Sequence, residues 1–133
     1  MSENGASAFK IDNSEWGDLQ NQFSGDLYHD HKVRTLYATD ASSYRIFPTA
    51  VAIPRSHEDI KLLVDFAIKN DIPLTPRAAG TSLSGQPIGR GIVVDVGRYM
   101  NQVLEVNKEE SWARIQPGVI RNCLLYTSDA ADE

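Results

Sequence analysis

The chain has 133 residues, a formal net charge of -5, 41% hydrophobic residues and 23% charged residues. This length suits about one domain, and the composition is ordinary for a globular chain. The acidic balance argues against binding to phosphate backbones, so no nucleic-acid partner is expected. No apolar run reaches the length of about eighteen residues that a membrane helix needs. The N-terminus also lacks the basic and apolar regions of a secretory signal, so we expect a cytoplasmic protein with no transmembrane segment.

Residues 1–46 are expected to form a lead-in segment before the main domain. The first part is rich in Ser, Asn, Gly and Asp, with a short helix predicted around Glu15 to Phe23, and we expect it to be frayed or peripheral. Aromatic and aliphatic residues return from Asp26 to Pro48 without a clean period, which indicates an ordered approach. His29 and His31 flank an aspartate, but no third ligand stands at a useful spacing, so no metal site is expected.

The clearest periodicity lies between residues 51 and 77. A short apolar run precedes Ser56, and Asp59 three residues later completes a capping pattern that predicts the start of a helix. The helix is expected to end by Asn70 or Asp71, and Leu74 to Arg77 is then short and extended. Strand, helix and strand predict a βαβ unit with parallel strands and a right-handed crossover. The predicted apolar stripe of the helix consists of Ile60, Leu63, Val64, Ala67 and Ile68.

Three further strands are predicted after residue 90. The run GIVVDV at residues 91–96 is rich in β-branched residues and suits a buried strand. The segments QVLEVN and SWARIQPG follow, separated by polar residues, and the alternation in the second segment predicts a hairpin. The predicted class is therefore α+β.

The stretch PRAAGTSLSGQPIGRG, residues 76–91, holds four of the nine glycines. Gly80 and Gly85 have the spacing of a P-loop, but Gln86 and Pro87 stand where that motif needs Lys and Ser or Thr. The dinucleotide fingerprint G-x-G-x-x-G is also absent, and a strand follows instead of a helix. Both phosphate-binding motifs that use a helix N-terminus are excluded.

Two interpretations of this glycine stretch remain open. Successive backbone N–H groups can converge on an anion as a nest, and the hydroxyls of Thr81, Ser82 and Ser84 can add donors. The alternative is an ordinary surface connection, because Gly, Ser and Pro mark loops in general. The spacing of the residues does not decide between them.

Four ordered motifs between Pro48 and Val119 carry a family resemblance. They read P-x-x-V-A-I-P-R-S-x-E-D-I, P-R-A-A-G-T-S-L-S-G-Q, G-I-V-V-D-V-x-R-Y-M-N-Q-V-L-E-V and A-R-I-Q-P-G-V. This part resembles the PCMH-type FAD-binding domain of the vanillyl-alcohol oxidase / p-cresol methylhydroxylase superfamily. It is most similar there to the branch of D-lactate dehydrogenases and glycolate oxidase flavin subunits. The resemblance implies the first lobe of such a domain, α+β and incomplete, over residues 47–122.

The same resemblance implies FAD as the cofactor. The segment from Arg77 to Gly85 would wrap the diphosphate with backbone N–H groups, and the segment 117–119 would lie against the flavin. No catalytic or metal-binding residue is implied within this chain. The implied cofactor-binding residues are Arg77, Ala78, Ala79, Gly80, Thr81, Ser82, Leu83, Gly85, Gln86, Pro117, Gly118 and Val119.

Two departures from the family pattern bear on the cofactor. Many relatives read R-G-x-G where this chain has Arg77-Ala78-Ala79-Gly80, so one alanine either has a negative φ or stores strain. Some relatives carry at the place of Thr81 a histidine that bonds covalently to the flavin. Threonine cannot form that bond, so FAD is expected to be held non-covalently.

The function implied by the resemblance is oxidation of a small 2-hydroxy acid, of the D-lactate or glycolate class, by hydride transfer to FAD. The electron acceptor stays open, and an iron–sulfur cluster would belong only to a further C-terminal part. The present chain by itself is expected to be inactive. Two alternatives are a non-catalytic nucleotide- or phosphate-binding module and a plain α+β interaction domain.

The last eleven residues, CLLYTSDAADE at 123–133, do not continue the family pattern. They resemble the translation of a transposase adaptor sequence, so we expect this segment to be a non-native tail. The single cysteine, Cys123, falls within it, and no disulfide or metal site is expected from one thiol.

Overall fold

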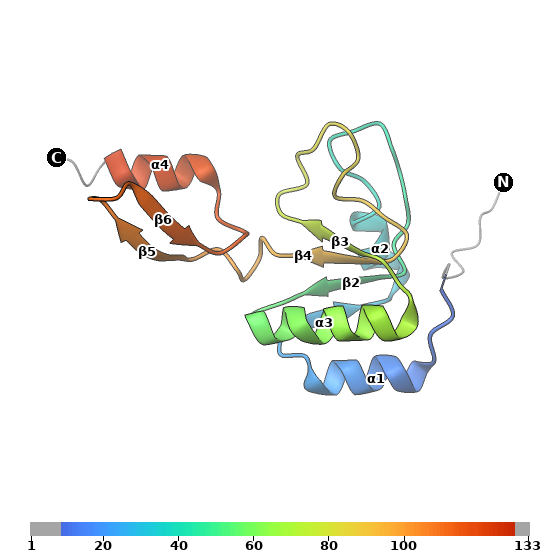
Figure 1. Ribbon diagram of the computed structural model, residues 1–133. Helices are drawn as coiled ribbons and strands as arrows, with labels where there is room; N and C mark the ends of the chain where they lie inside the picture. Colours follow the sequence, from blue (N-terminus) through green and yellow to red (C-terminus); the bar gives the residue numbers. More distant parts are fainter. Residues whose placement is uncertain (1–8, 130–133) are drawn as a thin grey trace.

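A four-stranded sheet forms the body of the molecule in the computed structural model, which describes residues 9–129 (Figure 1). Its strands are β1 (Asp26–Tyr28), β2 (Ala50–Ile53), β3 (Leu74–Arg77) and β4 (Ile92–Asp95), arranged in the order β1-β2-β4-β3. β4 pairs in parallel with both β2 and β3, while β1 pairs antiparallel with β2 at one edge. The predicted parallel arrangement of β2 and β3 is confirmed, and β4 lies between them.

Helix α3 (His57–Asn70) joins β2 to β3 and lies along one face of the sheet. It begins where predicted, because the Ser56 side chain accepts a hydrogen bond of 3.2 Å from the backbone N–H of Asp59. It ends at Asp71, whose left-handed φ of 49° stops the helix. Both ends of the predicted helix are confirmed.

The buried face of α3 differs from the predicted apolar stripe. Leu63 and Ala67 are buried as expected, but Ile68 is 75% exposed and Phe66 is buried instead. The reason is helix α1 (Asn13–Gln22), whose Trp16 ring packs 5.0 Å from the Phe66 ring. Because α1 packs on the flank of α3, the buried face of α3 includes Phe66 and leaves Ile68 exposed.

Over residues 9–25, helix α1 corrects the expectation of a frayed or peripheral segment; residues 1–8, which that expectation also covered, lie outside the described part. Trp16, Leu19 and Phe23 are all buried in the core cluster with residues of the sheet and α3. An ion pair of 2.8 Å between Glu15 and Lys69 joins the two helices at the surface. These three apolar residues, at helical spacing, anchor α1 in the core.

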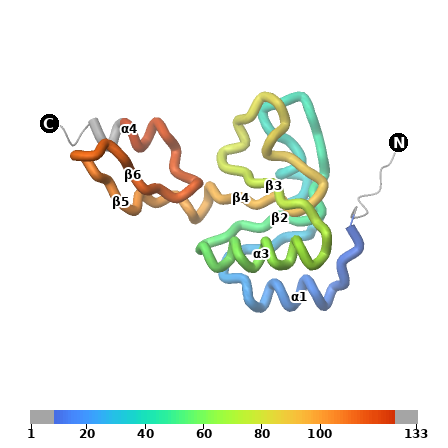
Figure 2. Tube along the Cα trace, viewed as in Figure 1, coloured from blue at the N-terminus to red at the C-terminus, as the bar shows by residue number. Residues whose placement is uncertain are grey.

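The opposite face of the sheet is covered by irregular segments and by α2 (His31–Leu36). Val51 and Val93, which point away from the core cluster under α3, are fully buried. A backbone hydrogen bond of 3.1 Å from Ala41 to the Gly80 carbonyl places the lead-in beside the glycine loop. Figure 2 shows these two loops side by side above the sheet.

The last elements stand apart from the sheet (Figures 1 and 2). β5 (Val103–Asn107) and β6 (Trp112–Ile115) form the predicted antiparallel hairpin, and α4 (Arg121–Asp129) follows. In the described part of the chain, no helix is long and apolar enough to cross a membrane. α4 runs across the expected boundary at residue 122, and the non-native origin of 123–133 stays a prediction.

Candidate functional site

The glycine loop leaves the carboxyl end of β3, at the edge where the parallel strands β2 and β4 also end. Gly80 and Gly85 have φ angles of 69° and 79°, which glycine adopts without strain. Ala78 and Ala79 are not among the described residues with positive φ. The chain therefore accommodates alanine in place of glycine here with an ordinary backbone conformation and no stored strain.

The main-chain N–H groups of this loop are free to bind a ligand. Within residues 9–129, the N–H groups of Gly80, Thr81, Ser82, Leu83 and Gly85 donate no hydrogen bond. The N–H of Ser84 donates to the Ser82 hydroxyl oxygen at 3.3 Å. Thr81 and Leu83 are exposed, and Gly80, Ser82 and Gly85 are half-buried, so these five donors are open to water or to an acceptor from outside the chain.

The side chains of the loop, unlike its backbone N–H groups, either bond one another or extend into solvent. The Ser82 hydroxyl donates to Oε1 of Gln86, so both groups hold the turn together. Leu83 is 80% exposed at the tip of the loop, and Thr81 is also exposed. The described side chains thus leave the backbone as the main source of donors.

Arg77 lies beneath the loop instead of extending into solvent. Its Nη1 donates a hydrogen bond of 2.7 Å to the Thr39 carbonyl, and its guanidinium stands 5.2 Å from the centre of the Tyr37 ring. A Cβ atom added to Gly80 would lie only 2.6 Å from Arg77 Nη2. Glycine at position 80 is therefore favoured mainly by its φ angle, since the guanidinium ends a flexible side chain and can shift away from an added Cβ.

The lead-in also supports the far side of the loop. A Cβ atom at Gly85 would lie 3.1 Å from Cδ2 of Tyr44, so the Tyr44 ring packs directly on this glycine. Together with the hydrogen bond from Ala41 to Gly80, this contact fixes the loop at both of its positive-φ residues.

Asp95, the last residue of β4, joins the lead-in to the turn that follows the strand. Its Oδ2 accepts a hydrogen bond of 2.5 Å from the Tyr37 hydroxyl, and its Oδ1 accepts one of 2.9 Å from the Gly97 N–H. Burial raises the pKa of Tyr37 well above its usual value, and the hydrogen bond to Asp95 raises it further. Asp95 therefore orders the turn, as carboxylates at strand ends commonly do.

Gly118 brings the second predicted segment to the same edge of the sheet. Its N–H donates a hydrogen bond of 2.8 Å to the Met100 carbonyl, and a Cβ atom there would lie 2.3 Å from the Val96 carbonyl oxygen. Gly97 lies between the two segments, because a Cβ atom on it would come within 3.4 Å of the Ala78 carbonyl oxygen. The backbone at 78, 97 and 118 thus forms a continuous path along this edge. Pro117 is exposed, and Val119 lines a groove with Gly97 and Gly118.

Gly97 lies between the predicted segments 77–86 and 117–119, and lead-in residues that sequence reasoning did not single out support the first of these segments. No spacing signal marks the lead-in residues, which contact the loop only through the tertiary fold. Gly97 alone had a local sign, since a glycine directly after a buried strand indicates a turn or a close approach. The additional residues are Tyr37, Thr39, Tyr44 and Gly97.

The two histidines of the lead-in have separate aromatic neighbours. The His29 ring centre lies 5.7 Å from that of Trp16, and the His31 ring stacks 6.0 Å from Phe47. Within the described part, no group of three or more His, Cys, Asp or Glu residues is arranged to hold a metal ion.

The chain also matches a known protein family. The family model described as "FAD binding domain" matches residues 48–127. D-2-hydroxyglutarate dehydrogenase of Escherichia coli (strain K12) is 39% identical over 108 residues, which are 79% of this chain and 11% of that protein. Glycolate oxidase subunit GlcD of Bacillus subtilis (strain 168) is 37% identical over 90 residues, 65% of this chain and 19% of that protein. The chain thus spans between a tenth and a fifth of the length of these relatives.

A solved structure shares the fold. p-Cresol methylhydroxylase with substrate bound superposes with a TM-score of 0.72 at 16% identity, over 92% of this chain and 26% of that one. At this identity the likeness concerns the fold alone, and it confirms the predicted α+β class and the PCMH-type architecture.

Proposed function

Because the chain belongs to the FAD binding domain family, we propose that residues 77–86 bind the diphosphate of FAD through main-chain N–H groups. The observation that carries the proposal is the set of N–H groups between Gly80 and Gly85 that donate to no acceptor within the described residues. They follow the carboxyl end of a parallel strand, where open α/β sheets commonly bind ligands. No helix N-terminus follows, so the donors come from the loop itself.

The residues present fit an anionic group. The Arg77 guanidinium lies against Gly80, which places a fixed positive charge directly under the turn with the free donors. The loop glycines let the backbone approach a ligand closely, and the exposed Thr81 hydroxyl stands available as a further donor. Since threonine forms no bond to a flavin ring, the cofactor is held non-covalently.

We further propose that Pro117, Gly118 and Val119 lie along the flavin. Gly118 is seated against the turn at 96–100 without room for a side chain, and the groove beside it is lined by Val119 and Gly97 together with Cys123 and Leu124 of α4. The path of backbone from residue 78 to residue 118 would then orient the cofactor along the edge of the sheet. Bound flavin supplies the acceptor for a hydride, while this chain binds and orients it.

The activity proposed for the whole protein is oxidation of a small 2-hydroxy acid. D-2-hydroxyglutarate and glycolate, the compounds in the names of the two relatives, share a hydroxyl beside a carboxylate, and D-lactate has the same group. None of the residues at the described site is assigned as the base that takes the hydroxyl proton. The chain is proposed to contribute cofactor binding to this reaction.

Titration of the protein with FAD tests the site. Binding should quench flavin fluorescence, and Gly80→Ala should weaken it strongly, because alanine is disfavoured at a φ of 69° and its Cβ would meet the Arg77 guanidinium. Gly17→Ala on α1 is the matched control, since no atom lies within 4 Å of its added Cβ. A protein that binds pyrophosphate but takes up no flavin would support the phosphate-binding module instead, and one that binds neither would refute the site.

The substrate class is tested separately on the intact gene product loaded with FAD. D-2-hydroxyglutarate, D-lactate and glycolate should be compared with an artificial electron acceptor, each against a matched compound that lacks the 2-hydroxyl group. Bleaching of the flavin absorbance by at least one hydroxy acid under anaerobic conditions is the expected result. Reduction by none of them would reject the proposed class and leave FAD binding standing.

A further inference from the structure

Tyr44 lies beside the far end of the glycine loop. A Cβ atom on Gly85 would stand 3.1 Å from Cδ2 and 3.7 Å from Cγ of Tyr44, so the ring packs on the backbone of this glycine. The start of the loop lies instead near the proposed flavin segment, because the Ala78 carbonyl oxygen would be 3.4 Å from a Cβ atom on Gly97 in the same groove. In Figure 1 the loop starts beside the turn that leads to the hairpin and rises to the lead-in. The free N–H groups between Gly80 and Gly85 therefore have the flavin segment at one end and an aromatic ring at the other.

A closed turn of the lead-in holds this ring in place. An antiparallel bridge pairs Thr39 with Arg45 at the base of the turn. Within it, the N–H of Ser42 donates a hydrogen bond of 2.8 Å to Oδ1 of Asp40, and the N–H of Tyr44 donates one of 3.2 Å to the Ser42 hydroxyl oxygen. The ring is thus positioned before a ligand arrives, and a contact made through it costs little conformational entropy.

The Tyr44 ring is also open, since the residue is 60% exposed. A single exposed aromatic residue is ordinary on a protein surface, so exposure by itself assigns no role. The position of the ring is what distinguishes it, because it borders a run of backbone donors that suits a phosphate group. A flat aromatic side chain next to a phosphate-binding backbone is suited to stack on the base of a nucleotide.

We propose that Tyr44 stacks on the adenine ring of the cofactor. The inference rests on the proposed function, because it concerns the other end of the same FAD molecule. In FAD the diphosphate joins riboflavin to adenosine. If the flavin lies along residues 117–119, the adenosine extends past the donors toward Gly85, where Tyr44 stands. The lead-in, which precedes the family match at residues 48–127, would then supply part of the nucleotide site.

A different role for Tyr44 is to support Gly85 and nothing more. In that case, loss of the ring would loosen the loop and weaken the binding of every ligand that carries a diphosphate. A ring that stacks on adenine would instead affect only those ligands that also carry the base. The two roles therefore predict different results for ADP and for pyrophosphate.

Isothermal titration calorimetry with these two probes and with FAD makes the test. Tyr44→Leu should weaken the binding of ADP and FAD about tenfold, the order of one stacked base, and leave pyrophosphate binding within about twofold. Tyr44→Phe keeps the ring and should bind all three as the unchanged protein does. Phe47→Leu is the matched control, since it removes a lead-in ring that stacks on His31, and it should change none of the three dissociation constants.

An equal loss of pyrophosphate binding by Tyr44→Leu would overturn the inference, because the ring would then only support the loop. Unchanged binding of ADP and FAD by that variant would also overturn it while leaving the FAD site intact. So would an unchanged protein that binds ADP no more tightly than pyrophosphate. If the unchanged protein binds no FAD, the proposed function fails and the inference falls with it. Should Tyr44→Leu fail to fold, Tyr44→Ile carries the same test with the same expected losses.

Discussion

The sheet and the hairpin differ in how their strands are held. β2 and β4 are buried on both faces, and none of Val51, Ile92 or Val93 is exposed at all. The apolar side chains of β5 and β6 are much more open, from 37% exposure at Trp112 to 55% at Leu104. Hydrophobic burial therefore stabilises the sheet, and the hairpin depends on other contacts.

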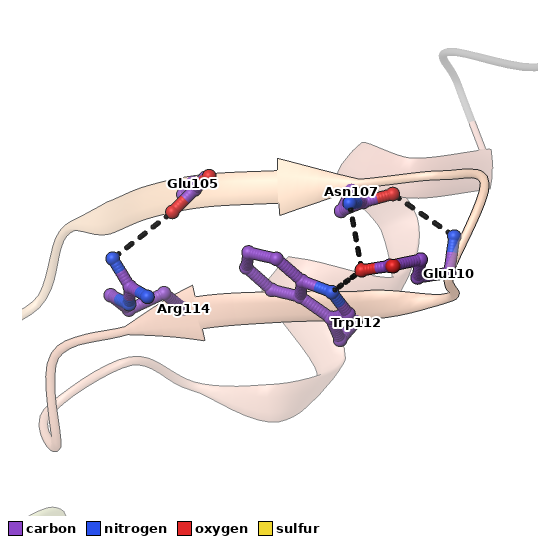
Figure 3. Close-up of polar contacts among 5 residues, drawn as sticks. All are labelled: Glu105, Asn107, Glu110, Trp112 and Arg114. Atoms are coloured by element: carbon purple, nitrogen blue, oxygen red, sulfur yellow. Dashed lines mark hydrogen bonds and ion pairs between the residues drawn. The ribbon is translucent and has the colours of Figure 1, made fainter.

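Polar side chains at the surface supply those contacts in the hairpin (Figure 3). Glu110 accepts hydrogen bonds from the indole N–H of Trp112, at 2.7 Å, and from the Asn107 amide, at 3.2 Å. Glu105 and Arg114 form an ion pair of 3.1 Å across the two strands. Exposed contacts of this kind contribute only about 0.2–1 kcal/mol each.

The two parts of the candidate site are attached to these two regions. The glycine loop extends from the sheet and is packed on a fully buried scaffold, whereas residues 117–119 connect to the hairpin. We expect the hairpin to open locally at a lower free energy than the sheet. One half of the site is then fixed by the body, and the other half depends on the joint at Gly118.

The largest expected effect separates the two regions directly. Leu63→Ala removes a fully buried side chain between α3 and the sheet and should lower the free energy of unfolding by about 3 kcal/mol. Leu104→Ala makes the same chemical change on the open hairpin, where the loss should stay below about 1 kcal/mol. Urea denaturation followed by Trp fluorescence measures both. Equal losses would show that the hairpin is packed as tightly as the sheet.

A polar contact inside the body should have the next largest effect. Asp59 is buried and accepts three hydrogen bonds, from the N–H and the hydroxyl of Ser24 and from the N–H of Arg55. Asp59→Asn turns one acceptor into a donor and should lower the free energy of unfolding by about 2 kcal/mol. Chemical denaturation at pH 7 is the measurement, and Asp65→Asn, exposed on the same helix, is the control.

The pH dependence of that contact has a definite sign. Burial favours the neutral form of Asp59, but the hydrogen bonds from Arg55 and Ser24 outweigh it, so the pKa is lowered from its usual value of 3.8. A carboxyl group with a lowered pKa in the folded state contributes stability that is present above the unfolded pKa and is lost as the pH falls through the folded one. Stability should therefore be level near neutral pH and fall below about pH 4. Asp59→Asn should fall less steeply there, and an equally steep fall would contradict the assignment.

A substitution at Gly118, where the sheet and the hairpin connect, should change the free energy of unfolding least among these variants but should clearly weaken FAD binding. Gly118→Ala places a Cβ atom 2.3 Å from the Val96 carbonyl oxygen, so the backbone must shift, at a cost of about 1–2 kcal/mol. Gly17→Ala meets no atom within 4 Å and lies inside α1, so it should stabilise by up to about 1 kcal/mol. Thermal unfolding and FAD titration of both variants measure this. Weaker FAD binding by Gly118→Ala alone is expected, and unchanged binding would separate residues 117–119 from the site.

Much of the fold could be predicted from local patterns. Ser56 and Asp59 mark the start of α3, and the β-branched run at 92–95 marks a buried strand, because capping and burial leave direct traces in the residue types. The exposure of Ile68 could not be predicted, since it depends on α1 packing against Phe66. The position of β4 between β2 and β3 likewise comes from pairing across the chain.

The site was predictable in part for the same reason. Glycine at 80 and 85 signals positive φ, and the structure places both residues there. The support from Tyr37 and Thr39 left no local trace, because the Tyr37 hydroxyl bonds Asp95, 58 positions away, and the Thr39 carbonyl bonds Arg77, 38 positions away. Contacts of that kind become visible only when the lead-in and the loop are seen side by side.

The backbone angle at Gly80 restricts how this loop can evolve. A side chain at position 80 would be strained by a φ of 69°, and its first carbon would lie 2.6 Å from a guanidinium that can swing aside as the end of a flexible side chain. Shortening residue 77 would remove that contact and discard the positive charge under the turn, but it would leave the φ angle unchanged. A change at position 77 therefore gives a side chain at position 80 no relief from its main source of strain, which is the backbone angle.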